Sequence, residues 1–447
     1  MSPDPRLISR RHLLSAGAIA GLGATFSGSR SDAAALVVPG ARQFTVNQPL
    51  VDAFVRRRGG PIGTSGKVAV AFRCDHHLNK FIQNLLPFHR KYQIPVTVAA
   101  MSQMFSIEAG VNGSTSMSFP ALQRMALENG FEVANHGATH RDAPTSQDLR
   151  NEIVHSKAKL SMSLPKLPIE LFVPPGVGGT GYQGFNGGLA PSSFQRYLAG
   201  RLILQEHALS TGYTPGYWSM SGDPLDSMGN VHVGLDAAVF ARRGPLFVQA
   251  AGQLGRGVSF MYHPSSLDTA GLQAIEQFMA WCAAERDAGR LEILTVTGLM
   301  MSSFSGSIRH NLLSGTSSFK SGWNGWNGSA ARWILQKEPA AWYARRGAQS
   351  AALFKDVLIG DHAGSVRQLR IPFRSPQGTR VRIEVFDVHF PGHLRVTREI
   401  SLPASADFRL VHQYLALPLT GTSIVRVQIT PLSGGELHVQ EPQLLAA

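Results

Sequence analysis

Strand-like and helix-like segments alternate along residues 67–300, and this alternation restricts the possible fold more than any other feature of the chain. Helical spacing of apolar residues is found at residues 81–92 and 120–129, with Gly130 placed as a helix stop signal. Such alternation is typical of parallel βαβ units, and over about 230 residues it favours a distorted (β/α) barrel over an open sheet. Short apolar runs that predict strands cover residues 67–74, 94–100, 131–135, 169–173, 215–220, 258–262 and 291–296.

The pattern changes at about residue 304. A passage rich in Ser, Gly, Trp and Asn leads into short β-like runs, and helical patterns are nearly absent. We therefore predict a C-terminal all-β sandwich, which is a candidate carbohydrate-binding domain. A length of 447 residues also favours two folded domains. The β-like runs cover residues 369–373, 381–388, 408–417 and 423–429.

The first 35 residues resemble a twin-arginine export signal. Arg10 and Arg11 precede a mildly apolar run rich in Gly and Ala, and small residues at 33–35 offer a cleavage site. The resemblance implies a bacterial protein that works in the periplasm or outside the cell. The predicted organisation is then a signal over residues 1–35, an N-terminal extension over 36–66, a catalytic domain over 67–303 and the β-sandwich over 304–447.

Composition narrows the class of partner. The formal net charge of +13 favours anionic partners, such as an acidic polysaccharide or the phosphate-bearing cell surface. No compact basic run or recognition motif indicates nucleic acid. No segment approaches the roughly 20 apolar residues of a membrane helix, so an integral membrane segment is not expected. Cys74 and Cys282 rule out a disulfide framework but leave one bridge between them open.

Chemically active side chains follow the predicted strands. The sequence HGATH places His136 and His140 four residues apart, just after the strand at 131–135, where two imidazoles can converge on one metal ion. In a barrel of parallel strands the carboxyl ends open on one face, so these groups are expected to share a site. The other strand-end candidates are Asp75, His76, Asp223, Asp226 and His263.

In their order and spacing these segments resemble the five motifs of the NodB-like polysaccharide deacetylases. That family has a strand ending in TFDD, an HxxxH pair, an RxPxG-like turn, a DxxDW-like segment and a strand ending in LxH. This chain has AFRCDHH, HGATH, FVPPG, WSMSGDPLD and FMYH, over roughly residues 67–300. The resemblance implies a hydrolase that removes N-acetyl groups from an amino-sugar polysaccharide by attack of a metal-bound water, with Zn²⁺ as the first choice of divalent ion.

The first motif departs from the family, in which the first of two aspartates is the base and the second binds metal. Because side chains alternate along a strand, extending it by two residues keeps their facing and places Asp75 as base and His76 as metal ligand. His76, His136 and His140 would then form a three-histidine site with one position left for water. In the competing register Asp75 is the ligand and the base is unassigned, while His77 remains a loop residue.

Four further positions carry hypotheses. The family's arginine, which orients the base, is replaced here by Val173, and Arg73 is the candidate to supply that charge; the alternative is a surface arginine without a catalytic role. His263 is the candidate acid for the leaving amine, with Asp223 or Asp226 holding it protonated. The alternative for His263 is a hydrogen-bonded histidine of the core. The alternative for Asp223 and Asp226 is a simple turn without a catalytic role.

Two other classes of function fit the same sequence. The first is a non-catalytic carbohydrate-binding protein that kept the barrel after losing the double aspartate and the arginine. An enzyme would release acetate from an acetylated glycan, whereas this binding protein would not. A nucleic-acid or cell-surface adhesion role would depend on the positive charge, and its sign would be binding that weakens steeply with salt.

Overall fold

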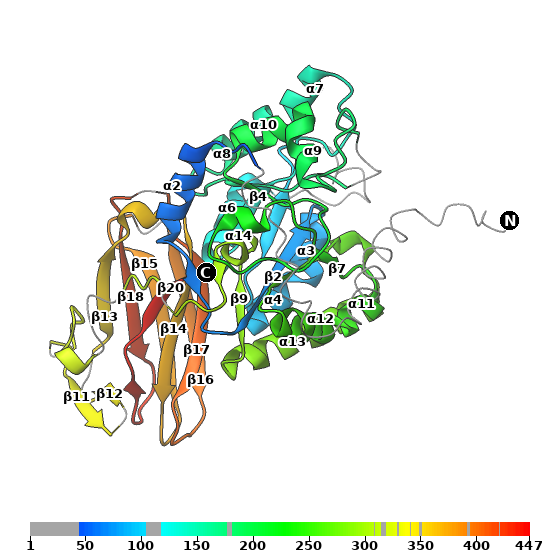
Figure 1. Cartoon of the computed structure of the whole chain (residues 1–447). Coiled ribbons are helices and arrows are strands. Elements are labelled where there is room, and N and C mark those ends of the chain that lie inside the picture. Colours follow the sequence, from blue (N-terminus) through cyan, green and yellow to red (C-terminus); the bar gives the residue numbers. More distant parts are fainter. Residues whose placement is uncertain are drawn as a thin grey trace.

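The computed structural model describes residues 44–103, 118–176, 181–307, 309–313, 319–328, 330–339, 341–347, 351–390, 394–419 and 421–447. An α/β domain comes first along the chain and antiparallel sheets follow it (Figure 1). The export signal predicted for residues 1–35 lies outside the described residues. In the described ranges, no helix has the length and apolar character that crossing a bilayer requires.

The α/β domain is built on a parallel sheet with strand order β6-β5-β4-β3-β2-β8-β7. β9 pairs with residues 68–71 of β2, and β3 pairs with residues 73–75. Since β8 also pairs with residues 70–74, β3 and β9 share the opposite edge of β2. The strands are β2 (Val68–Asp75), β3 (Thr97–Ala100), β4 (Glu132–Asn135), β5 (Leu171–Phe172), β6 (Leu209–Ser210), β7 (Val233–Gly234), β8 (Val258–Tyr262) and β9 (Leu291–Leu294). This curled half-barrel confirms the predicted distorted (β/α) class.

Helices connect and cover these strands. Val70, Phe72 and Cys74 of β2 pack in one apolar cluster, while Ala69 and Ala71 pack in another, as the alternation of side chains requires. β1 (Ile62–Gly63) pairs in parallel with β10 (Ser302–Ser303). The α-helices are α2 (Gln48–Arg58), α3 (Leu78–Asn84), α4 (Leu86–Tyr92), α6 (Phe119–Asn129), α7 (Ser146–Arg150), α8 (Ser156–Ser163), α9 (Pro191–Arg196), α10 (Leu198–Glu206), α11 (Ala238–Arg242), α12 (Gly244–Gln253), α13 (Thr269–Asp287) and α14 (Val296–Met300). The π-helix η4 (Asn151–His155) joins α7 to α8, and the 3-10 helices are η5 (Pro224–Ser227), η6 (Pro264–Ser266), η7 (Phe319–Ser321) and η8 (Gly360–His362).

Some local predictions need correction. The helix expected at residues 81–92 is divided at Leu85 into α3 and α4, because Pro87 lacks the amide hydrogen that a continuous helix needs and fits the first turn of a new one. The strand expected at 215–220 is not formed, and Trp218 makes only an isolated bridge to Gly257. β6 and β7 were not predicted, since two residues are too few to show a period.

The C-terminal region is all-β, as predicted. One sheet has the order β11-β12-β19-β14-β17 with β20 also on β14, and the other has the order β13-β18-β15-β16. Val381, Ile383 and Val385 of β15 are buried at every second position, which is the pattern of a strand with one face in a core. The strands are β11 (Trp333–Glu338), β12 (Ala341–Arg346), β13 (Leu353–Leu358), β14 (Val366–Arg374), β15 (Thr379–Asp387), β16 (Arg395–Leu402), β17 (Arg409–Ala416), β18 (Ile424–Pro431), β19 (His438–Val439) and β20 (Gln443–Ala446).

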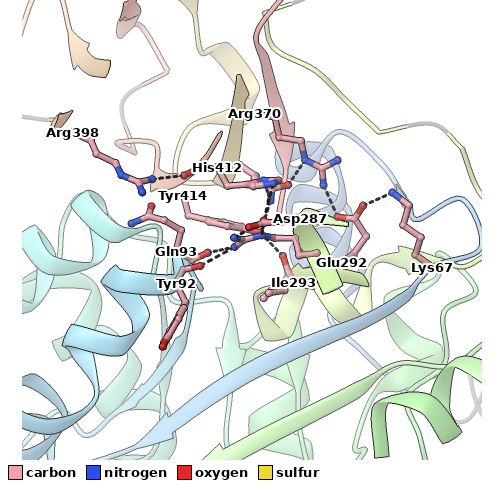
Figure 2. Close-up of polar contacts among 12 residues, drawn as sticks. Lys67, Tyr92, Gln93, Asp287, Glu292, Ile293, Arg370, Arg398, His412 and Tyr414 are labelled. Carbon is pink, nitrogen blue, oxygen red and sulfur yellow. Dashed lines mark hydrogen bonds and ion pairs between the residues drawn. The ribbon is translucent and has the colours of Figure 1, made fainter. Parts of the chain in front are cut away.

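Polar side chains join the all-β region to the α/β domain (Figure 2). Glu292 of β9 accepts hydrogen bonds from Arg309 at 2.9 Å and Arg370 at 2.5 Å, and the Tyr414 hydroxyl donates to the carbonyl of Ile293 at 2.9 Å. Burial raises the pKa of Glu292, but the charges of Arg309 and Arg370 lower it by a larger amount, so the net pKa is about 2. The carboxylate is therefore ionised and fully paired, which fixes the sheet that carries β14 and β17 against the α/β domain.

Cysteine and tryptophan side chains add to the core. Cys74 and Cys282 are buried thiols, so the bridge left open by the sequence is not formed. Trp326 and Trp333 are buried, and Trp342 packs against the core. These rings therefore contribute mainly to packing in the all-β region.

Candidate metal and catalytic site

The carboxyl end of β2 carries a buried ion pair. Arg73 and Asp75 lie two residues apart and so share the sheet face of Ala71. Arg73 Nε donates to Asp75 Oδ1 at 2.7 Å and Arg73 Nη2 donates to Oδ2 at 2.8 Å, with the two residues only 2% and 3% exposed. Burial raises the pKa of Asp75, but the charges of Arg73, His136 and His263 together outweigh it and hold the pKa well below 3.8. Asp75 is thus an ionised carboxylate held in one orientation.

The chain turns sharply after Asp75. His76 and His77 have φ values of 40° and 49°, in the left-handed region that residues with a side chain rarely adopt. Such strained positions concentrate at functional sites. The turn brings the His76 ring to centroid distances of 5.2 Å from His140 and 5.1 Å from His263. His77 is half-buried at the start of α3, and burial followed by the charges of His263 and His140 lowers its pKa.

HGATH follows β4 and supplies two more imidazoles. His136 Nδ1 donates to the carbonyl of Val173 at 2.8 Å, so the lone pair is on Nε2, which is buried and has no hydrogen-bond partner among the described residues. His76 Nδ1 is likewise buried and has no hydrogen-bond partner among the described residues. One ring nitrogen from each of His76, His136 and His140 lies within 4.8 Å of the others. This is the spacing of a group that can share one metal ion.

Glu152 of the π-helix η4 shapes this loop. Its carboxylate accepts from the backbone amides of Ala138 and Thr139 at 2.8 and 3.1 Å, and from the Tyr182 hydroxyl at 3.2 Å. Gly137 has a φ of +83°, and a Cβ there would lie 2.7 Å from Glu152 Oε2, so this position requires glycine. Sequence reasoning missed Glu152, because an acidic residue inside a helical segment usually faces solvent. Its burial and its hydrogen bonds with the Ala138 and Thr139 amides show that it supports the histidine loop.

His263 follows β8 and is paired with Asp236. The ring Nδ1 lies 2.7 Å from Asp236 Oδ2, and the His263 amide donates to Asp236 Oδ1 at 2.7 Å. Burial lowers the pKa of His263, but the hydrogen bond and charge of Asp236 raise it more, so the net pKa is above 6.5. The predicted pairing with Asp223 or Asp226 is corrected by this contact.

Asp223 and Asp226 instead belong to the 3-10 helix η5. Asp223 is its N-cap, and its Oδ1 accepts from the amide of Leu225 at 2.9 Å. Pro224 in the first turn fixes a helix start, because proline has no amide hydrogen to lose there. The alternative in which SGDPLD is a simple turn therefore fits Asp223 and Asp226. Asp236 was missed because the two residues of β7 before it carry no strand pattern.

Comparisons with known proteins point to one family. Residues 63–181 match the family model for polysaccharide deacetylases, a segment that contains β2 and HGATH. This part of the chain is therefore similar in sequence to polysaccharide deacetylases. No curated protein is significantly similar in sequence.

Solved structures with a similar arrangement have low identity. A structure described as "T48 deacetylase with substrate" is 15% identical, with a TM-score of 0.32, over 53% of this chain and 92% of that one. A family 4 carbohydrate esterase from Streptomyces lividans in complex with acetate is 18% identical, with a TM-score of 0.31, over 53% and 96%. A family 4 pseudoenzyme from Bacillus anthracis is 13% identical, with a TM-score of 0.32, over 53% and 66%. Similarities at this level say nothing about activity.

Proposed function

We propose that this protein is a metal-dependent hydrolase that removes acyl groups from an amino sugar of a polysaccharide. The observation that carries the proposal is the group of His76, His136 and His140, with ring nitrogens within 4.8 Å of one another. Asp75 and His263 lie beside this group as an ionised carboxylate and a histidine with a raised pKa. The family match over residues 63–181 supports the same class of reaction.

The histidine group fits a divalent transition metal. Burial, followed by the charges of neighbouring histidines, lowers the pKa of His76, and burial lowers that of His136 to about 3, so both rings are neutral and offer lone pairs. Nitrogen ligands suit Zn²⁺ better than Mg²⁺ or Ca²⁺, which prefer oxygen. A divalent cation held by these rings would act as a Lewis acid that lowers the pKa of water and polarises the acyl carbonyl.

The chain's own residues would move the protons. Asp75 is ionised and accepts the proton of the attacking water, and the two hydrogen bonds from Arg73 fix the direction of its carboxylate. Asp75 is not part of the histidine group, which supports the register in which it is the base and His76 a ligand. His263, whose ring centroid is 5.1 Å from that of His76, donates a proton to the departing amine.

Acetate release from an N-acetylated chitooligosaccharide tests the proposal. We expect turnover by the purified full chain with Zn²⁺, loss of turnover on chelation and recovery when metal is added back. Bound oligosaccharide without acetate release, for every divalent metal tried, would favour the non-catalytic carbohydrate-binding protein instead.

The pH profile should depend on Asp236. Since Asp236 raises the pKa of His263, Asp236→Asn lowers that pKa, and the proton that His263 donates is lost at lower pH. We expect the alkaline limb of the kcat/KM profile to move to lower pH in this variant. The free energy of unfolding should also depend on this proton. Protonated His263, paired with Asp236, stabilises the fold below pH 6.5, and this contribution is lost as the pH rises through the raised pKa of His263. Asp223→Asn, which changes only the cap of η5, should leave the limb in place; an unmoved limb in Asp236→Asn would assign the proton to another group.

We extend the proposal to location and partner. The twin-arginine segment at residues 1–35 favours export to the periplasm or beyond, where polysaccharide substrates occur. Residues 1–35 hold four arginines and two aspartates, so their removal lowers the net charge from +13 to +11, and this excess favours an anionic polysaccharide over a neutral one. An N-terminal sequence of the secreted protein that begins near residue 36 is the expected result.

A further inference from the structure

His232, directly before β7, faces the same site and has no role so far. Its Nδ1 is buried without a hydrogen-bond partner in the described part of the chain, while the residue keeps partial exposure. Burial lowers its pKa well below 6.5, and the charges of Arg73, Asp75, His263 and His136 also act on it. The ring is therefore neutral. Its position also follows from the chain around it: β7 pairs with β8, which His263 follows, and Arg73 Nη1 donates to Thr211 Oγ1 at 3.4 Å, two residues before Tyr213.

Tyr213 reaches His232 from the other end of the sheet. The two ring centroids are 6.1 Å apart, with the rings inclined at 70°. Tyr213 follows β6 and His232 precedes β7, and these strands are the two ends of the parallel sheet. A parallel bridge between Thr214 and Asn230 joins the two segments, and the amide of Gly212 donates to the carbonyl of Asn230 at 3.1 Å. The curl of the sheet thus closes at this pair of rings.

We propose that Tyr213 and His232 bind the sugar ring that carries the acyl group. This proposal rests on the hydrolase function and names the residues that select its substrate. A neutral imidazole has one donor and one acceptor, which matches a hydroxyl group, and it has no charge to attract an anion. Arg73, the nearby cation, already has its Nε and Nη2 on Asp75. Tyr213 adds an aromatic face for the apolar side of a pyranose and a hydroxyl at its tip.

The chemistry of these two side chains sets the substrate class. A buried ring nitrogen without a partner is costly, and a sugar hydroxyl would satisfy it on binding. A small acyl ester has no hydroxyl to offer and gains nothing from His232. The pair should therefore distinguish an acylated pyranose from a simple acyl ester at the same reaction centre.

Kinetics with two substrates test the pair. We expect His232→Ala to lower kcat/KM for an N-acetylated chitooligosaccharide by about tenfold, the effect of one hydrogen bond, and to change that for 4-nitrophenyl acetate by less than about twofold. Tyr213→Ala should show the same selectivity. His232→Asn, which keeps a donor and an acceptor, should recover part of the loss. His310→Ala is the matched control, since His310 Nδ1 is also buried without a partner but its ring contacts His362.

Equal losses on both substrates, or no loss on either, would overturn the assignment. Calorimetric binding of the chitooligosaccharide to the metal-free full chain separates this proposal from the hydrolase function. If the wild type binds the oligosaccharide without turning over either substrate, loss of binding in His232→Ala keeps the sugar site and rejects the hydrolase. Unchanged binding in His232→Ala, or a wild type that does not bind, rejects the sugar site. If thermal unfolding shows that His232→Ala does not fold, the same kinetic and binding measurements on His232→Asn and Tyr213→Ala test the sugar site instead.

Discussion

Asp75→Asn is expected to stop turnover while the metal stays bound. A positioned general base contributes about 10²- to 10⁴-fold to rate, so kcat should fall by a factor in this range. Metal content should not change, because the histidine group does not include Asp75. Acetate release and elemental analysis of the same preparation measure both effects. Loss of the metal together with activity would make Asp75 a ligand, as in the competing register.

The same variant should also lose stability. Arg73 is 2% exposed, and without the Asp75 charge its guanidinium stays buried with no counter-ion. Breaking a buried pair on one side costs about 3–5 kcal/mol, and the amide oxygen that remains should hold the loss near the lower value. Urea unfolding measures it. Glu399→Gln is the control, since Glu399 pairs with the exposed Arg382 at 2.6 Å and its loss should change little.

His136→Ala is expected to remove the metal. His136 is the buried member of the histidine group and already has its Nδ1 on the Val173 carbonyl, so its Nε2 is positioned for an ion. Loss of a direct ligand should lower metal affinity by more than the about 10- to 100-fold that changes in supporting residues cause. For the wild type, metal at about 100 times Kd should raise the free energy of unfolding by about 2.7 kcal/mol. In His136→Ala this increase and the acetate release should both vanish.

His155→Ala gives the matched control for that experiment. His155 is exposed at the end of η4 and lies outside the histidine group, so stabilisation by metal should be that of the wild type. A His136→Ala protein that is still stabilised by metal and still releases acetate would remove the proposed centre.

The sequence alone determined the features that depend on local pattern. The period of β2 placed Arg73 and Asp75 on one face, and the structure shows them in direct contact. The four-residue spacing in HGATH placed His136 and His140 near a common point, and alternating segments predicted the α/β class. These signals can be read because side-chain direction repeats every two residues in a strand and every 3.6 in a helix.

Only the tertiary structure decided which distant groups meet. Asp236 rather than Asp223 reaches His263, Glu152 turns inward beneath HGATH, and Tyr213 approaches His232 where the ends of the sheet come together. Strands of two residues, such as β6 and β7, have no period, yet they set these contacts through the curl of the sheet. The contact of Arg370 with Glu292 likewise depends on how the all-β region packs on β9. Pairings between residues far apart in the chain follow from packing, which leaves no repeat in the sequence to reveal them.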